Sequence, residues 1–110
     1  MKVSDICNIP GFKVLNNELD IDRTVNGCYI SDLLSWVMGH AKPMNAWITI
    51  MSHMNIVAIA SLLELSCIII AEGEIPDKQA LRKAVEENVI IISADCSSFE
   101  VAKKLIDLGI

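Results

Sequence analysis

Two short apolar runs separated by a helix-length segment dominate the middle of the chain, at residues 46–73 (AWITIMSHMNIVAIASLLELSCIIIAEG). The runs cover residues 47–51 and 67–71, and both are rich in isoleucine. Neither run alternates with polar residues, which is typical of strands that are covered on both faces in a parallel sheet. Residues 55–65 between them supply the crossover of about a dozen residues that parallel strands require. The stretch therefore predicts a right-handed strand–helix–strand unit.

A membrane span is the competing interpretation of this stretch, because about 20 apolar residues can cross a bilayer. Residues 54–71 are nearly long enough and nearly apolar. However, Glu64 would lie in the middle of the span, where a carboxylate is costly, and no Lys/Arg cluster flanks the segment to set its orientation. The N-terminal residues MKVSDIC also lack the apolar region of a signal peptide. We therefore expect a cytoplasmic protein without a membrane partner.

The C-terminal half continues the same alternation of strands and helices. Residues 77–87 and 97–109 have the pattern of amphipathic helices, and residues 89–93 (VIIIS) form a third apolar run. Ser97 and Glu100 have the spacing of a capping box at the start of the last helix. Successive strand–helix units predict an α/β fold, with a mostly parallel sheet and helices on both faces.

The N-terminal half adds a short helix at residues 4–7, capped by Ser4, and strands at 12–15 and 24–30. A second helix is expected to begin at Ser31, its N-cap. The apolar stripe of this helix, expected to face the core, consists of Leu33, Leu34, Val37 and Met38. Trp36 lies off this stripe, so we expect it to be exposed and available to a partner.

The chain has 110 residues with a net charge of −5, which predicts one domain covering residues 1–110. An acidic chain does not offer the basic patch that a nucleic-acid partner needs. The four cysteines are far apart and form no C-x-x-C pair, so we expect reduced thiols and no metal site. These residues are Cys7, Cys28, Cys67 and Cys96.

Polar residues follow each apolar run, and open parallel sheets bind ligands beyond the carboxyl ends of their strands. The loops at residues 52–55, 72–74 and 93–97 leave such ends, and two of them lead into helix N-termini, which favour anions. The candidate ligand-binding residues at this edge are Ser52, His53, Asn55, Gly73, Ser93, Asp95 and Ser97. The alternative is that Ser52, Asn55, Asp95 and Ser97 only cap helices, which every helix requires.

Catalysis at this edge would depend on His53 acting with Asp95, or on Cys96 activated by His53. Neither pair belongs to a motif. The sequence also lacks the P-loop, dinucleotide-binding, nucleophile-elbow and H-E-x-x-H motifs. We therefore predict no enzymatic activity, no catalytic residue and no cofactor.

Four segments together resemble a stand-alone DRTGG domain: GCYISDLLSWVM (27–38), WITIMSHMNIVAIASL (47–62), IIIAEGEIPD (68–77) and ISADCSSFEVAKKL (92–105). The resemblance covers nearly the whole chain. It implies a fold related to the N-terminal domain of HPr kinase/phosphorylase. DRTGG domains also occur within phosphotransacetylases and within pyrophosphatases that carry CBS domains, as accessory and often dimerising modules.

The two elements that give the family its name differ in this chain. Ser52-His53-Met54-Asn55 stands at the start of the central helix, where the resemblance implies Asp-Arg. Ala71-Glu72-Gly73 stands where it implies Thr-Gly-Gly, so that only Gly73 is retained. These departures resemble a stand-alone subgroup of the family.

The resemblance, the missing catalytic motifs and the mean hydropathy of +0.47 predict a non-enzymatic regulatory or interaction module. A surface more apolar than one small core needs also predicts a homodimer. The alternative is a sensor that binds a nucleotide or another phosphorylated small molecule at the edge that carries His53, Gly73 and Asp95.

Overall fold

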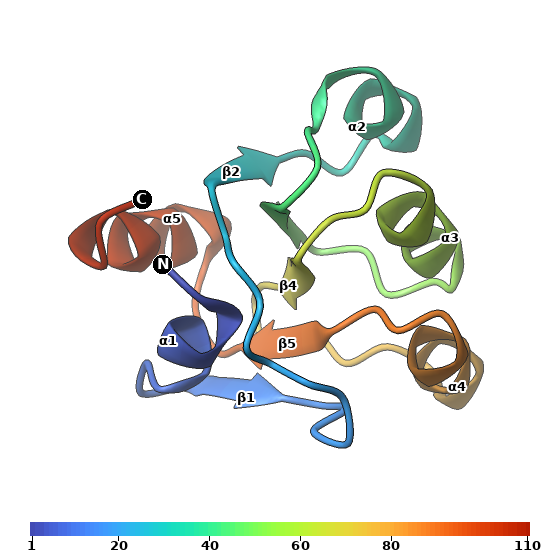
Figure 1. Cartoon of the computed structure of the whole chain (residues 1–110), viewed down its shortest axis with the longest axis horizontal. Coiled ribbons are helices and arrows are strands. Elements are labelled where there is room, and N and C mark those ends of the chain that lie inside the picture. The colour runs from blue at the N-terminus through green and yellow to red at the C-terminus, as the bar shows by residue number, and fades with distance from the viewer.

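A five-stranded sheet forms the centre of the protein, in a computed structural model that describes residues 1–110. The strand order is β1-β5-β4-β3-β2 (Figure 1). The strands β2 to β5 pair in parallel, whereas β1 pairs antiparallel with β5. The α/β class is therefore as predicted, but the sheet is mixed. The bounds are β1 Phe12–Val14, β2 Gly27–Ile30, β3 Asn45–Thr49, β4 Cys67–Ile70 and β5 Ile91–Ala94.

Helices cover both faces of the sheet, as the sequence predicted (Figure 1). From β2 to β5, each strand lies next to the preceding one and on the same side of it. Because crossovers between parallel strands are right-handed, the helices that connect these strands all lie on one face of the sheet. These helices are α2, α3 and α4, whereas α1 and α5 lie against the opposite face. The bounds are α1 Val3–Cys7, α2 Leu34–His40, α3 Asn55–Leu62, α4 Lys78–Glu86 and α5 Ser98–Asp107.

Two apolar cores result, one on each face of the sheet. Side chains alternate between the faces along a strand, so Ile69 enters the core under α1 and α5 while Ile68 and Ile70 enter the core under α2, α3 and α4. Trp47 and Ile91 flank Ile68 in register on the two neighbouring strands. All of these side chains are completely buried, each contributing about 1.5–3 kcal/mol through removal from water. This double burial explains why the runs lack polar alternation.

None of the five helices is both long enough and apolar enough to cross a bilayer. The central helix α3 is shorter than expected, because Leu63 ends it and Glu64 turns the backbone into the left-handed region, at φ 57°. Glu64 is exposed in this turn, and its carbonyl accepts the N–H of Met44 at 2.9 Å.

Two predicted N-caps are wrong. Ser31 does not cap α2: the N-cap is Leu33, without a side-chain cap, and the Ser31 hydroxyl accepts the N–H of Leu33 at 3.1 Å. Asp32 instead accepts hydrogen bonds from the Thr49 hydroxyl and from the N–H of Ile50, at 2.7 and 2.9 Å. These bonds fix the segment after β2 to the end of β3, so the helix begins two residues later.

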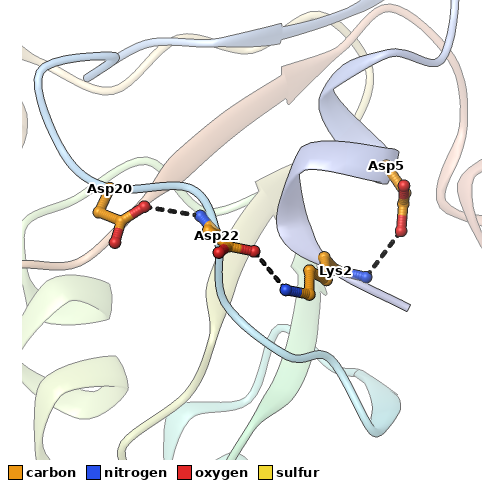
Figure 2. Close-up of polar contacts among 4 residues, drawn as sticks. All are labelled: Lys2, Asp5, Asp20 and Asp22. Carbon is orange, nitrogen blue, oxygen red and sulfur yellow. Dashed lines mark hydrogen bonds and ion pairs between the residues drawn. The ribbon is translucent and has the colours of Figure 1, made fainter.

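Helix α1 begins earlier than expected, because Lys2 rather than Ser4 is its N-cap. The Asp5 carboxylate accepts the N–H of Lys2 at 2.9 Å, and the Lys2 ammonium group donates to Asp22 at 2.5 Å (Figure 2). Asp20 in turn accepts the N–H of Asp22 at 2.9 Å. The hydrogen bond to Asp22 raises the pKa of Lys2, although an exposed ion pair of this kind contributes little to stability. The contacts tie the N-terminus to the irregular segment that leads into β2.

Asn16 joins the end of β1 to β5 and is 1% exposed. Its amide nitrogen donates to the Val89 carbonyl at 2.6 Å, and its amide oxygen accepts the N–H of Ile91 at 3.0 Å. Two buried backbone groups therefore depend on one side chain.

We expect Asn16→Ala to lower the free energy of unfolding by about 2–4 kcal/mol, because it leaves a buried N–H and a buried C=O without partners. The matched control is the exposed neighbour Asn17→Ala, which should change stability by less than about 0.5 kcal/mol. Urea unfolding of both variants measures the difference. Equal stability of the two variants would show that Asn16 does not connect the strands.

Candidate functional site

The parallel strands β4 and β5 are neighbours in the sheet, but the chain leaves their carboxyl ends in different directions. From β4 it runs to α4 on one face of the sheet, and from β5 it runs to α5 on the opposite face. Such a point is where open α/β sheets bind ligands. Here the two loops are hydrogen-bonded to each other. The N–H groups of Glu72 and Gly73 donate to the carbonyls of Cys96 and Ala94, both at 2.7 Å. These backbone donors are therefore not available to a ligand.

The structure brings together the predicted site residues of these two loops. The Ser93 hydroxyl donates to the Glu74 carbonyl at 3.2 Å, which adds a third bond between the loops. Ser97 caps α5 by accepting the N–H of Glu100 at 3.2 Å. Gly73 adopts a left-handed backbone, at φ 70°. Each of these residues has a visible role in closing or capping the edge.

Asp95 lies over Gly11, at the turn before β1. Its N–H donates to the Gly11 carbonyl at 3.2 Å, and a Cβ atom placed on Gly11 would lie 2.3 Å from a carboxylate oxygen of Asp95. Gly11 also has a φ of 87°, which side chains disfavour. The glycine in the Pro-Gly turn thus makes room for the carboxylate.

Ser52, His53 and Asn55 form a separate group after β3. The strands β3 and β5 lie on either side of β4, so the groups are roughly 10 Å apart at the usual strand spacing. The ring atom Nδ1 of His53 accepts the N–H of Asn55 at 3.2 Å, and Met54 is the N-cap of α3, without a side-chain cap. His53 shares no hydrogen bond with Asp95 or Cys96, so neither of the two pairs on which catalysis would depend is assembled in this structure.

The environment at the end of β5 disfavours a thiolate at Cys96. Partial burial raises the pKa of Cys96, and the carboxylates of Glu100, Asp95 and Glu72 raise it further, against the opposing effect of Lys104. A reactive cysteine needs the opposite environment, which lowers its pKa. Cys96 therefore lacks the activation that a nucleophile requires.

The remaining cysteines are free thiols that pack against the core under α1 and α5. Burial raises the pKa of Cys28 to about 11, and it raises the pKa values of Cys7 and Cys67 as well. No group of three or more His, Cys, Asp or Glu side chains is placed to hold a metal ion.

The surface hollows lie away from the predicted residues. The largest, about 380 Å³, is an open groove between α4 and the segment after β1, with Leu15 and Leu81 among its walls. A second, about 300 Å³, surrounds Arg23 and Asn88, and a third, about 220 Å³, lies beside Met54 and Arg82. None of the three contains a predicted site residue.

The helical pattern of the sequence predicted that Leu33 and Met38 face the core, and the structure shows both side chains exposed. Of the predicted inward stripe, Val37 is buried and Leu34 is half-buried against the core, whereas Leu33 is 60% and Met38 49% exposed. Trp36 is exposed as predicted, and its ring stacks on His40 at a centroid distance of 4.2 Å. Leu33 and Trp36 lie three residues apart, so they share one exposed side at the start of the helix, and we call these two residues the α2 surface.

No family model and no curated protein matches the chain. Among solved structures, the chain is similar to the CBS and DRTGG domains of the regulatory region of Clostridium perfringens pyrophosphatase, which was crystallised with its activator, diadenosine tetraphosphate. The TM-score is 0.68 at 16% sequence identity, over 92% of this chain and 44% of the other. The chain thus spans less than half of that regulatory region. The likeness supports a DRTGG-like α/β fold.

The contact between Asp95 and Gly11 predicts that Gly11→Ala lowers the free energy of unfolding by about 1–3 kcal/mol, through backbone strain and overlap with the carboxylate. In an Asp95→Ala background the loss should be smaller, because the overlap is removed and only the strain remains. The control is Gly39→Ala, which has no heavy atom within 4 Å and should raise stability by about 0.5–1 kcal/mol. Additive effects of the Gly11 and Asp95 substitutions would contradict this placement.

The buried thiols predict a loss of stability at alkaline pH. Above pH 9 the unfolded chain releases the Cys28 proton, whereas the folded chain retains it until about pH 11. The folded state then binds more protons than the unfolded state, so the free energy of unfolding should fall as pH rises from 9 to 11. Cys28→Ala should reduce the slope of this fall in urea unfolding under reducing conditions. An unchanged slope would show that Cys28 does not contribute to it.

Proposed function

We propose that this chain is a regulatory module without catalytic activity, which acts by associating with a second copy of itself in the service of a metabolic enzyme or pathway. The observation that carries the proposal is the DRTGG-like fold, which the chain shares with a regulatory region rather than with a catalytic domain. The adjacent exposed side chains of Leu33 and Trp36 support association as the mode of action, since apolar side chains gathered at a surface mark interaction sites.

The roles of the polar residues at the carboxyl edge also support this proposal. Ser93 and the amides of Glu72 and Gly73 bond the β4 and β5 loops to each other, and Ser97 caps α5. A catalytic site instead needs an acid, base or nucleophile that is held close to a partner group.

A small-ligand sensor is the second candidate function. It is favoured by the nucleotide activator of the similar regulatory region and by the helix N-termini at this edge, where His53, Gly73 and Asp95 lie. Around Cys96, the carboxylates of Glu72, Asp95 and Glu100 would repel a phosphate, whereas the Lys104 ammonium group would attract it. We rank association first because the amides of Glu72 and Gly73 are bonded to the neighbouring loop and are not free to bind a phosphate.

A thermal-shift screen with adenine and guanine nucleotides and phosphorylated metabolites, together with light scattering, separates the two functions. We expect a dimer at micromolar concentrations and no change in melting temperature with any ligand at millimolar concentration. Ligand binding to the folded state alone would raise the melting temperature by mass action.

A reproducible rise of several degrees that Asn55→Ala or Asp95→Ala removes would establish the sensor instead. A strict monomer throughout the micromolar range would contradict self-association. The control for both variants is their unliganded melting temperature, which shows whether the fold is retained.

A further inference from the structure

The hollow around Arg23 and Asn88 lies at the amino ends of β4 and β5, on the opposite edge of the sheet from the predicted ligand-binding residues. We infer that this hollow binds a small aliphatic α-amino acid, whose carboxylate bonds to Arg23 and whose ammonium group faces Glu64. Neither the likeness to known proteins nor the proposed self-association assigns a ligand to this place in the fold.

Three segments that are distant in sequence form the hollow, which has a volume of about 300 Å³. They are the chain before β2, the end of α3 with the turn after it, and the end of α4 with the residues after it. Its polar lining residues are Arg23, Ser61, Glu64, Glu87 and Asn88, and Leu65 and Val89 add apolar surface. Ligand sites of about 300–1,000 Å³ combine apolar walls with a few polar groups in this way. The volume is at the lower end of that range, so the hollow suits a molecule smaller than a nucleotide.

Arg23 is held in place by three hydrogen bonds to uncharged acceptors. Its Nε donates to the Asp20 carbonyl at 2.9 Å, Nη1 donates to the Asn88 carbonyl at 2.8 Å, and Nη2 donates to the Asn88 side-chain oxygen. No carboxylate lies within 4.0 Å of the guanidinium group. Two of its five N–H groups therefore remain for a ligand, and an anionic group is the acceptor that an arginine binds most strongly.

Glu64 supplies the opposite charge in the same hollow. Its carboxylate is exposed and takes part in no hydrogen bond or ion pair within the protein. The other carboxylate, that of Glu87, is already paired with Lys83 at 3.1 Å and accepts the Ser61 hydroxyl at 3.4 Å. The hollow thus contains one cation without a carboxylate partner and one carboxylate without a cation.

The positions of α3 and α4 make a positive group favourable beside Glu64. The two helices lie side by side, and both end at the hollow (Figure 1). The C-terminal end of a helix carries a partial negative charge and attracts cations. A ligand with only a carboxylate would be repelled by these helix ends and by Glu64, and a ligand with only an amine would be repelled by Arg23. A zwitterion avoids both costs.

An α-amino acid is the zwitterion that this hollow fits. It carries its ammonium and carboxylate groups on one carbon atom, so both groups can enter a space of this size. An aliphatic side chain would cover Leu65 and Val89 without burying another polar group, which would need a partner of its own. Branched aliphatic amino acids are therefore the ligands that we expect to bind, with L-leucine as the first probe.

Isothermal titration calorimetry of the full chain with L-leucine, L-isoleucine and L-valine tests the site. We expect saturable binding of leucine and a rise in melting temperature by mass action. Two analogues of leucine separate the charges, since 4-methylpentanoate lacks the ammonium group and 3-methylbutylamine lacks the carboxylate. Each should bind at least about tenfold more weakly than leucine, because each leaves one charged group of the hollow without a partner.

Substitutions test which residues hold the two charged groups. Glu64→Gln should weaken leucine binding about tenfold, and it should preserve the fold because the Glu64 carboxylate has no hydrogen bond within the protein. Arg23→Gln should abolish detectable binding, and its unliganded melting temperature shows whether losing the bonds to Asn88 alters the fold. The matched control is Glu86→Gln, which removes an exposed carboxylate of α4 that does not line the hollow and should leave binding unchanged.

Leucine binding that is lost in Arg23→Gln and weakened in Glu64→Gln, but not in Glu86→Gln, would establish the site. Failure of all three amino acids to bind, or equal leucine affinity in the wild type and Glu64→Gln, would overturn it. Equal binding of leucine and either analogue would also overturn it, because a zwitterion would then not be required. Light scattering measures the oligomeric state separately, so this inference and the proposed self-association can each fail without the other.

Discussion

The structure depends on burying both faces of the three inner strands β3, β4 and β5. The central strand β4 is completely buried along its whole length, with β3 and β5 on either side. A strand in this position cannot tolerate solvent on either face, so it requires one layer of helices above the sheet and another below. The positions of α2, α3 and α4 on one face and of α1 and α5 on the other follow from that requirement.

The ends of the sheet are less constrained, and there the two sides of the molecule differ. At one end, β1 is held antiparallel against β5, and Asn16 satisfies buried backbone groups of the neighbouring segment. At the other end, β2 and α2 complete the fold with only one fully buried residue in the helix. The helix contributes Val37 and the half-buried Leu34 to the core, while Leu33 and Trp36 remain exposed.

The carboxyl edge shows how a favourable position in a fold differs from a functional site. It has the divergent loops and helix N-termini that ligand sites use. However, its backbone donors are bonded across the two loops and are not free to bind a ligand. The chemistry of the residues, rather than the fold position, determines what an edge of this kind can bind.

The sequence by itself determined the α/β class, the parallel order of the last three strands along the chain and the two-sided burial, because apolar runs without alternation permit few other arrangements. It also located the exposed Trp36. Only the tertiary structure decided the direction of β1, since three residues carry no signal of strand direction. It also showed that Asp32 bonds to β3, which delays α2 and makes Ser31 a poor guide to the start of the helix. Finally, only the tertiary structure showed that Leu33 and Met38 are exposed. A helical stripe predicts which residues share an apolar side, but it does not tell whether the sheet extends far enough to cover them.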